Sequence, residues 1–111
     1  MLTVEKLKEF GADTASGVAR CVNNEAFYLR MVNMALSDAN YGRLENAIHA
    51  GDWQAAFEAA HALKGVLANL ALTPILTPVQ EITELLRVWT DAPYEDMLET
   101  ILEKKRELDA L

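Results

Sequence analysis

Apolar residues recur at intervals of three and four along most of this chain, which is the spacing that gives a helix one buried face. The clearest case runs from Trp53 to Leu70. At about 100° per residue, the apolar face of this stretch consists of Ala56, Ala59, Ala60, Leu63, Val66, Leu67 and Leu70. No stretch alternates apolar and polar residues over the length of a strand. The pattern predicts an all-α protein with this stretch as its central helix.

Capping and turn residues divide the rest of the chain into further helices. Gly51 is a typical helix end and Asp52 a typical N-cap, so a tight connection leads into the central helix. Thr73-Pro74 predicts an N-cap and the start of the next helix, which we expect to become regular only after Pro78. A turn at residues 91–93 then precedes the final helix. The apolar stripe of that helix consists of Met97, Leu98, Ile101, Leu102 and Leu108.

The segment from Asn24 to Ala50 allows two interpretations, one long helix or two helices broken at Ser37-Asp38. Apolar residues repeat every seven positions through it, at Phe27, Met34, Tyr41 and Ile48. A true break usually resets that phase. We therefore expect one long, bent helix with Asn23 as its N-cap.

Two short helical segments come first. Thr3 caps the first and Gly11 ends it, and Asp13 caps the second, which reaches about as far as Cys21. Helices this short are not stable alone and must pack on the rest of the chain. We predict one domain over residues 1–111, an antiparallel up-and-down four-helix bundle with a short N-terminal helical cap. The bundle helices are expected to have about 18 to 27 residues each.

The composition narrows the class of protein. A formal net charge of −7 argues against nucleic acids and anionic membranes as partners, because both select basic surfaces. The single cysteine excludes an internal disulfide and a cysteine-based zinc site. Neither His49 nor His61 is followed four residues later by a metal-ligating residue, so no metal site is expected. No apolar run is long enough for a signal peptide or a membrane span, which favours a cytoplasmic protein.

One polar cluster on the central helix has no obvious structural purpose. His61 points almost opposite the apolar face, with Lys64 one turn on to one side and Gly65 one turn on to the other. An exposed glycine inside a helix costs about 1 kcal/mol relative to alanine. Neutral imidazole is a nucleophile near neutral pH, which makes His61 a candidate for chemistry. His49 lacks such neighbours and lies near a helix end, so we interpret it as structural.

These residues resemble the signature of a known family. The sequence Ala60-His61-Ala62-Leu63-Lys64-Gly65 is similar to that of histidine-containing phosphotransfer (HPt) domains of phosphorelays. The resemblance extends to the helix order and to the positions Phe10-Gly11, Ala47-Ile48, Gly51-Asp52, Leu70 and Ile82. The chain departs from the family at Ala71, where glycine is usual, and at Val66, where serine is frequent.

The resemblance implies a phosphocarrier without turnover of its own, not an enzyme. His61 would accept a phosphoryl group from an aspartate of a receiver domain and pass it to the aspartate of another. Lys64 would neutralise charge on the phosphoryl oxygens, and Gly65 would leave room for the partner. The implied partners are response-regulator receiver domains and a hybrid histidine kinase. The receiver would hold Mg²⁺, and this chain, as a monomer, would bind no cofactor of its own.

Family members commonly hold the second imidazole nitrogen with a polar residue of the following helix. Counting without gaps places Thr83 at that position, and Gln80 lies one turn earlier on the same face. Phe57 lies one turn before His61. It belongs either to an apolar docking patch with Ala68 or to the core.

Two alternative functions fit the same bundle. A phosphate-independent adaptor or kinase antagonist would bind its partners equally well without His61. An input domain cut from a longer histidine kinase would also show this pattern, although the start at Met1 and the short length favour a free-standing protein.

Overall fold

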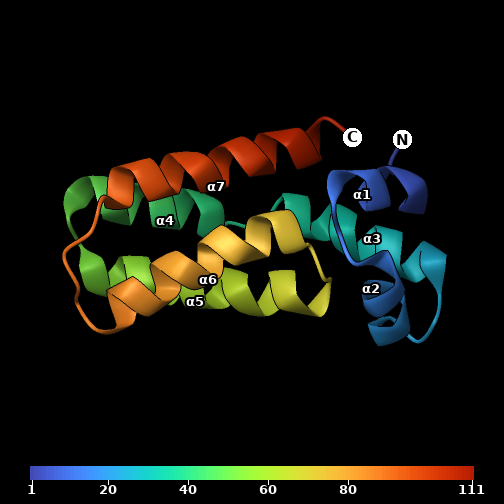
Figure 1. Cartoon of the computed structure of the whole chain (residues 1–111), viewed down its shortest axis with the longest axis horizontal. Coiled ribbons are helices and arrows are strands. Elements are labelled where there is room, and N and C mark those ends of the chain that lie inside the picture. The colour runs from blue at the N-terminus through green and yellow to red at the C-terminus, as the bar shows by residue number, and fades with distance from the viewer.

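Four antiparallel helices form the body of the protein. The computed structural model describes all 111 residues, and none of them lies in a strand. The bundle helices are α4 (Asn40–Ala50), α5 (Trp53–Asn69), α6 (Thr73–Arg87) and α7 (Tyr94–Asp109). Each helix packs against the next one along the chain, and α7 closes the ring against α4 (Figure 1). The predicted all-α, up-and-down four-helix bundle is confirmed.

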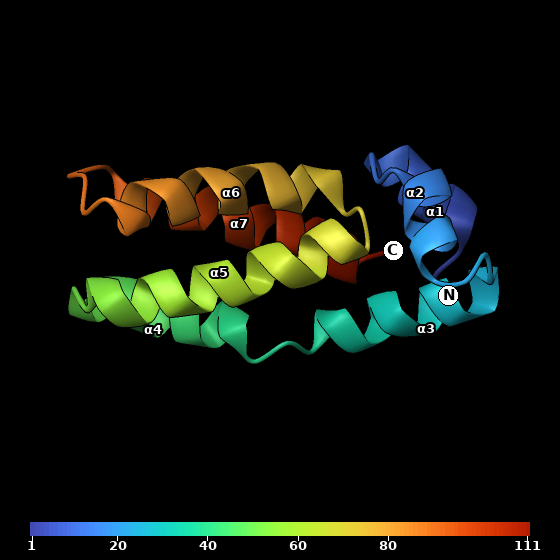
Figure 2. The same ribbon diagram turned by 90° about the horizontal axis from the view of Figure 1, so that it is seen from below.

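The three N-terminal helices cover one end of this bundle. They are α1 (Val4–Phe10), α2 (Thr14–Arg20) and α3 (Glu25–Leu36). In Figure 1 they lie on the right, opposite the end that holds the α4–α5 and α6–α7 connections. The molecule measures 40 × 24 × 20 Å along its principal axes. Figure 2 shows α3 extending beyond α4 along the longest of them. The predicted N-terminal cap is therefore present, and it includes α3 as well.

Local capping residues set most helix ends where the sequence predicts them. The hydroxyl of Thr3 and the carboxylates of Asp13 and Asp52 each accept a hydrogen bond from the backbone N–H three residues on, at 3.1, 3.2 and 3.1 Å. Gly11 and Gly51 end α1 and α4 with φ angles of 114° and 68°. Glycine adopts this left-handed conformation without the steric penalty that a Cβ brings.

The predicted single long helix over residues 24–50 is wrong. The chain leaves helical geometry at residues 37–39, between α3 and α4. The carboxylate of Asp38 accepts a hydrogen bond from the N–H of Asn40 at 2.8 Å, which satisfies a free donor at the start of α4. The predicted N-cap of α3 is also one residue off, because the Asn24 side chain, not that of Asn23, accepts a hydrogen bond, from the N–H of Phe27 at 3.0 Å.

The break shifts the buried face of α3 relative to the predicted seven-residue repeat. Within α3, Tyr28 and Val32 are buried, whereas the repeat positions Phe27 and Met34 are 37% and 63% exposed. The later repeat positions lie in α4 and are buried. The two helices pack on different partners, α3 against α2 and α7 and α4 against α5 and α7. Each helix therefore follows the neighbours it packs against.

The bundle helices are shorter than predicted, with 11, 17, 15 and 16 residues for α4 to α7. Helix α6 begins one residue earlier than expected, with Leu72 as its N-cap and Thr73 already helical. It is continuous through Pro78, so the predicted irregular start is not seen. The buried side chains of Ile75 and Val79 on either side hold this turn against the core.

A buried tyrosine joins the N-terminal helices to the bundle. Tyr28 of α3 is fully buried, and its hydroxyl donates a hydrogen bond to the carbonyl of Leu70 at the end of α5, at 3.0 Å. Burial raises the pKa of Tyr28 to about 12. A Cβ on Gly17 of α2 would overlap the tyrosine ring, so α2 can approach this closely only at a glycine. Three segments therefore meet at one side chain.

Candidate functional site

Helix α5 presents His61 to solvent because its opposite face is used up in packing. Ala56, Ala60, Leu63 and Leu67 are all buried, and α5 packs against both α4 and α6. Alanines on this face allow the neighbouring helices to approach closely. His61 is exposed, as the helical projection predicts.

The space next to His61 is open at Gly65. A Cβ built on Gly65 meets no atom within 4 Å, and the backbone there is helical, which does not require glycine. Neither packing nor conformation therefore explains this residue. What glycine provides at this position is a bare stretch of helix surface beside the imidazole.

An aromatic ring supports the imidazole from the preceding turn. The rings of Phe57 and His61 are stacked, with centroids 5.6 Å apart and an interplanar angle of 13°. Phe57 is half-buried and packs against the core, as the core alternative predicts, and its role in docking stays a prediction. Ala68, its predicted companion, is half-buried too, and its carbonyl accepts a hydrogen bond from the guanidinium of Arg20 in α2.

Charged side chains of α6 lie beside this stack. The Nζ atom of Lys64 lies 4.0 Å from Oε1 of Glu84, and Oε2 of Glu84 lies 3.1 Å from Nε of Arg87. The guanidinium of Arg87 in turn lies over the ring of Phe57, 5.2 Å from its centroid. These contacts connect Lys64 with the Phe57–His61 stack through α6. The Lys64 side chain is only 26% exposed, so its stem is already held in place.

The sequence did not point to Glu84 and Arg87. Their spacing of three residues is that of an ordinary helical ion pair on a solvated face. Which residues of α6 lie opposite His61 depends on the register between two helices, and that register follows from packing.

The two predicted hydrogen-bond partners of the imidazole are not brought to it. Thr83 is fully buried, and its hydroxyl donates to the carbonyl of Val79 within α6 at 2.6 Å. Gln80 is exposed, and its side chain has no hydrogen-bond partner in the chain. The carboxylate of α6 that pairs with this cluster is that of Glu84, through Lys64.

The sequence pattern of the Hpt domain family matches residues 33–111, which is more than two thirds of the chain. The chain belongs to the Hpt domain family. Hpt domains are phosphocarriers rather than enzymes, so its general role is histidine phosphotransfer in two-component signalling, with receiver domains and histidine kinases as its general class of partners. Neither the curated proteins nor the solved structures gave a match. The matched range of this Hpt domain begins within α3, so Phe10-Gly11, part of the predicted resemblance, lies outside it.

The departure of this Hpt domain from the usual glycine at Ala71 has a visible structural consequence. Ala71 follows the C-cap of α5 and has a φ angle of 55°, in the left-handed region that glycine favours. Its N–H donates to the carbonyl of Ala68, and its carbonyl accepts from the N–H of Asp13 at 3.0 Å. The backbone therefore keeps the conformation that suits glycine although an alanine occupies it.

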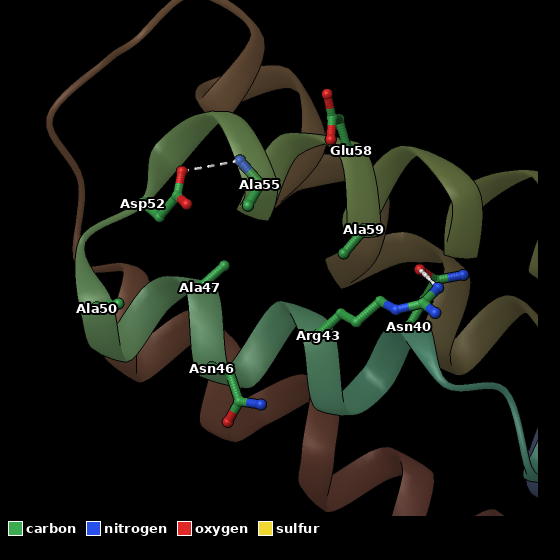
Figure 3. A pocket seen from close by; sticks show the side chains of 9 residues that line it. All are labelled: Asn40, Arg43, Asn46, Ala47, Ala50, Asp52, Ala55, Glu58 and Ala59. Atoms are coloured by element: carbon green, nitrogen blue, oxygen red, sulfur yellow. Dashed lines mark hydrogen bonds between the residues drawn. The ribbon is translucent and has the colours of Figure 1, made fainter.

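The largest cavity of the Hpt domain is a groove of about 570 Å³ between α4 and α5, and neither His61 nor Lys64 lines it. In Figure 3 the Arg43 side chain reaches toward Asn40, whose side-chain oxygen lies 3.4 Å from the guanidinium. The carboxylate of Asp52 caps α5. The carboxylate of Glu58 accepts a hydrogen bond from the side-chain amide of Gln54, one turn before it. The charged groups of the groove therefore have partners on their own helices.

No group of three or more His, Cys, Asp or Glu side chains is arranged to hold a metal ion. No helix is both long and apolar enough to cross a membrane.

Proposed function

We propose that this Hpt domain is a phosphorelay intermediate that accepts a phosphoryl group on His61 from a receiver-domain aspartate and passes it to another receiver aspartate. The observation that carries the proposal is the exposed imidazole on a rigid helix, with Lys64 on one side and open space at Gly65 on the other. A convex site of this kind suits a partner that encloses it.

The chemistry asks little of the chain itself. The lone pair of one imidazole nitrogen attacks phosphorus, the N–P bond forms as the P–O bond to the aspartate breaks, and the electron pair leaves with the carboxylate. Transfer to the second receiver is the same exchange in reverse. Phosphoryl transfer depends mainly on positioning and on neutralising charge on the equatorial oxygens. Stacking on Phe57 restricts the rotation of the imidazole and so supplies part of that positioning.

Lys64 is the group of this chain that meets the phosphoryl charge. Its ammonium is paired with Glu84 at 4.0 Å, a loose contact that costs little to exchange for a phosphoryl oxygen. Arg87 is fixed by Glu84 and the Phe57 ring, which keeps a second cation close to the same edge of α5. The remaining charge is met by Mg²⁺ on the receiver, so this chain needs no metal of its own.

The test is phosphotransfer from a phosphorylated receiver domain. Incubation with the ³²P-labelled receiver should place label on this protein that is labile in acid and stable in alkali, as expected for phosphohistidine. His61→Gln should abolish the label. His49→Gln is the matched control, because His49 is the other histidine of the chain and its side chain is also exposed.

Label that survives in His61→Gln would refute the proposal, and so would label that depends on His49. A receiver or kinase that binds the His61→Gln protein normally, while the wild-type protein takes up no label, would instead support a phosphate-independent adaptor.

A further inference from the structure

A second cluster of side chains lies at the end of the bundle that the N-terminal helices leave uncovered. A cavity of about 120 Å³ opens there between the start of α5, the end of α6 and the start of α7. The rings of Trp53, Trp89 and Tyr94 line it, together with Leu86, Thr90 and Asp91. This volume is about four times the share of one water molecule in the liquid, which is enough for the end group of a side chain.

The aromatic surface around the cavity is exposed. Trp89 is 68% exposed and the neighbouring Val88 is 66% exposed. Trp53 is held at the cavity wall by Tyr94, with ring centroids 5.1 Å apart, and the Tyr94 hydroxyl donates to the carbonyl of Thr90. Trp89 has a φ angle of 58°, a conformation that L-residues rarely adopt and that costs about 1 kcal/mol. Large exposed apolar side chains in a strained turn are typical of binding sites.

Asp91 is the one charged residue that lines this cavity. The sequence that follows the end of α6, residues 88–103, contains five carboxylates and no lysine or arginine. The nearest preceding cation, Arg87, is engaged by Glu84 and Phe57 on the other side. Aromatic faces and a carboxylate together attract cations, whereas the lack of any group of three metal-ligating side chains argues against a metal ion.

We propose that this cavity binds an arginine side chain of a partner protein. A guanidinium is planar, so it can stack on an indole face while it pairs with the Asp91 carboxylate. Residues beside the arginine would cover the exposed Val88 and Trp89, which a small free cation would leave exposed. The proposal is independent of phosphotransfer, although Trp53 lies only eight residues before His61 on α5, about 12 Å along the helix.

The two tryptophans of the chain both line the cavity, so their indole N–H signals in NMR spectra report on this site alone. The probe is the peptide acetyl-Gly-Arg-Gly-amide, with the Gln peptide as its uncharged match. We expect saturable shifts of both signals with the Arg peptide, weakened by salt, and at least about fivefold weaker binding of the Gln peptide.

Variants then locate the binding. Trp89→Ala and Asp91→Asn should each weaken binding of the Arg peptide about two- to fivefold. Glu103→Gln removes an equal charge from an exposed position of α7 outside the lining and should leave binding unchanged. Melting curves confirm that each variant is folded.

Three results would overturn the proposal. The first is absence of saturable shifts, or equal shifts with the Arg and Gln peptides. The second is unchanged binding in both Trp89→Ala and Asp91→Asn. The third is a shift of the indole signals on dilution without peptide, which would show that a second copy of the chain covers this surface.

Discussion

Replacing Gly65 separates the stability of this protein from its proposed function. Gly65 lies inside α5 with no atom within 4 Å of an added Cβ, so alanine fits without strain. Alanine is favoured over glycine in a helix interior by about 1 kcal/mol, and Gly65→Ala should stabilise the protein by that amount. At about 2.1 cal/mol/K per residue, the unfolding entropy of 111 residues is about 230 cal/mol/K, so the Tm should rise by about 4 °C.

A longer side chain at the same position should affect transfer more than folding. Gly65→Gln also replaces glycine by a better helix former, so we expect a melting temperature at or above that of the wild type. Its side chain, however, would occupy the bare surface beside His61 that a receiver must approach. We expect the rate of phosphotransfer from a labelled receiver to fall by at least about tenfold, which corresponds to about 1.4 kcal/mol in the transition state.

Gly42 in α4 offers a matched control, because it too is helical and exposed, and an added Cβ meets no atom within 4 Å. Gly42→Ala and Gly42→Gln should change stability as their counterparts at Gly65 do and leave transfer unaffected. Normal transfer by Gly65→Gln would refute the role of the glycine in access. Destabilisation by Gly65→Ala would show that the space beside it is not open.

Three further predictions concern other residues. Lys64→Ala should slow phosphotransfer about tenfold while the melting temperature changes little, because the contact with Glu84 is loose, and Lys64→Arg should restore part of the rate. Ala71→Gly should raise the free energy of unfolding by up to about 1 kcal/mol in urea titrations, since glycine removes the left-handed penalty; a loss of stability would contradict this. The raised pKa of Tyr28 contributes stability that is fully present below pH 10 and is lost as the pH rises toward 12. Tyr28→Phe should therefore flatten the fall in the free energy of unfolding at alkaline pH. An unchanged slope of this free energy against pH would contradict the prediction.

Features of the fold that depend on a few neighbouring residues could be predicted from sequence. Thr3, Gly11, Asp13 and the Gly51-Asp52 pair define helix ends through bonds to their own or adjacent turns, so no distant contact is needed to read them. The exposure of His61 is equally local, because it follows from the angle between residues on one helix.

Features that depend on packing between helices could not be predicted from the sequence. The seven-residue repeat through α3 and α4 gave the wrong buried face for α3, because Tyr28 is drawn into the joint with α2 and the end of α5. Packing between helices also explains why the predicted partner of the imidazole is wrong. The family resemblance, counted without gaps, placed Thr83 opposite the imidazole, whereas the register of α5 and α6 brings Glu84 to Lys64 and turns Thr83 into the core.

The contacts of Tyr28 mean that the range matched by the family and the range that packs into one core begin at different residues. The family match begins at residue 33, yet Tyr28 and Leu7 before it are fully buried, and the Lys6 ammonium donates to the carbonyl of Leu111 at 3.1 Å. A fragment cut at the border of the match would keep every residue of the proposed site and lose the side chain that seals the end of α5. The first 32 residues lie outside the family match, yet they supply side chains that complete the buried core at this end of the bundle.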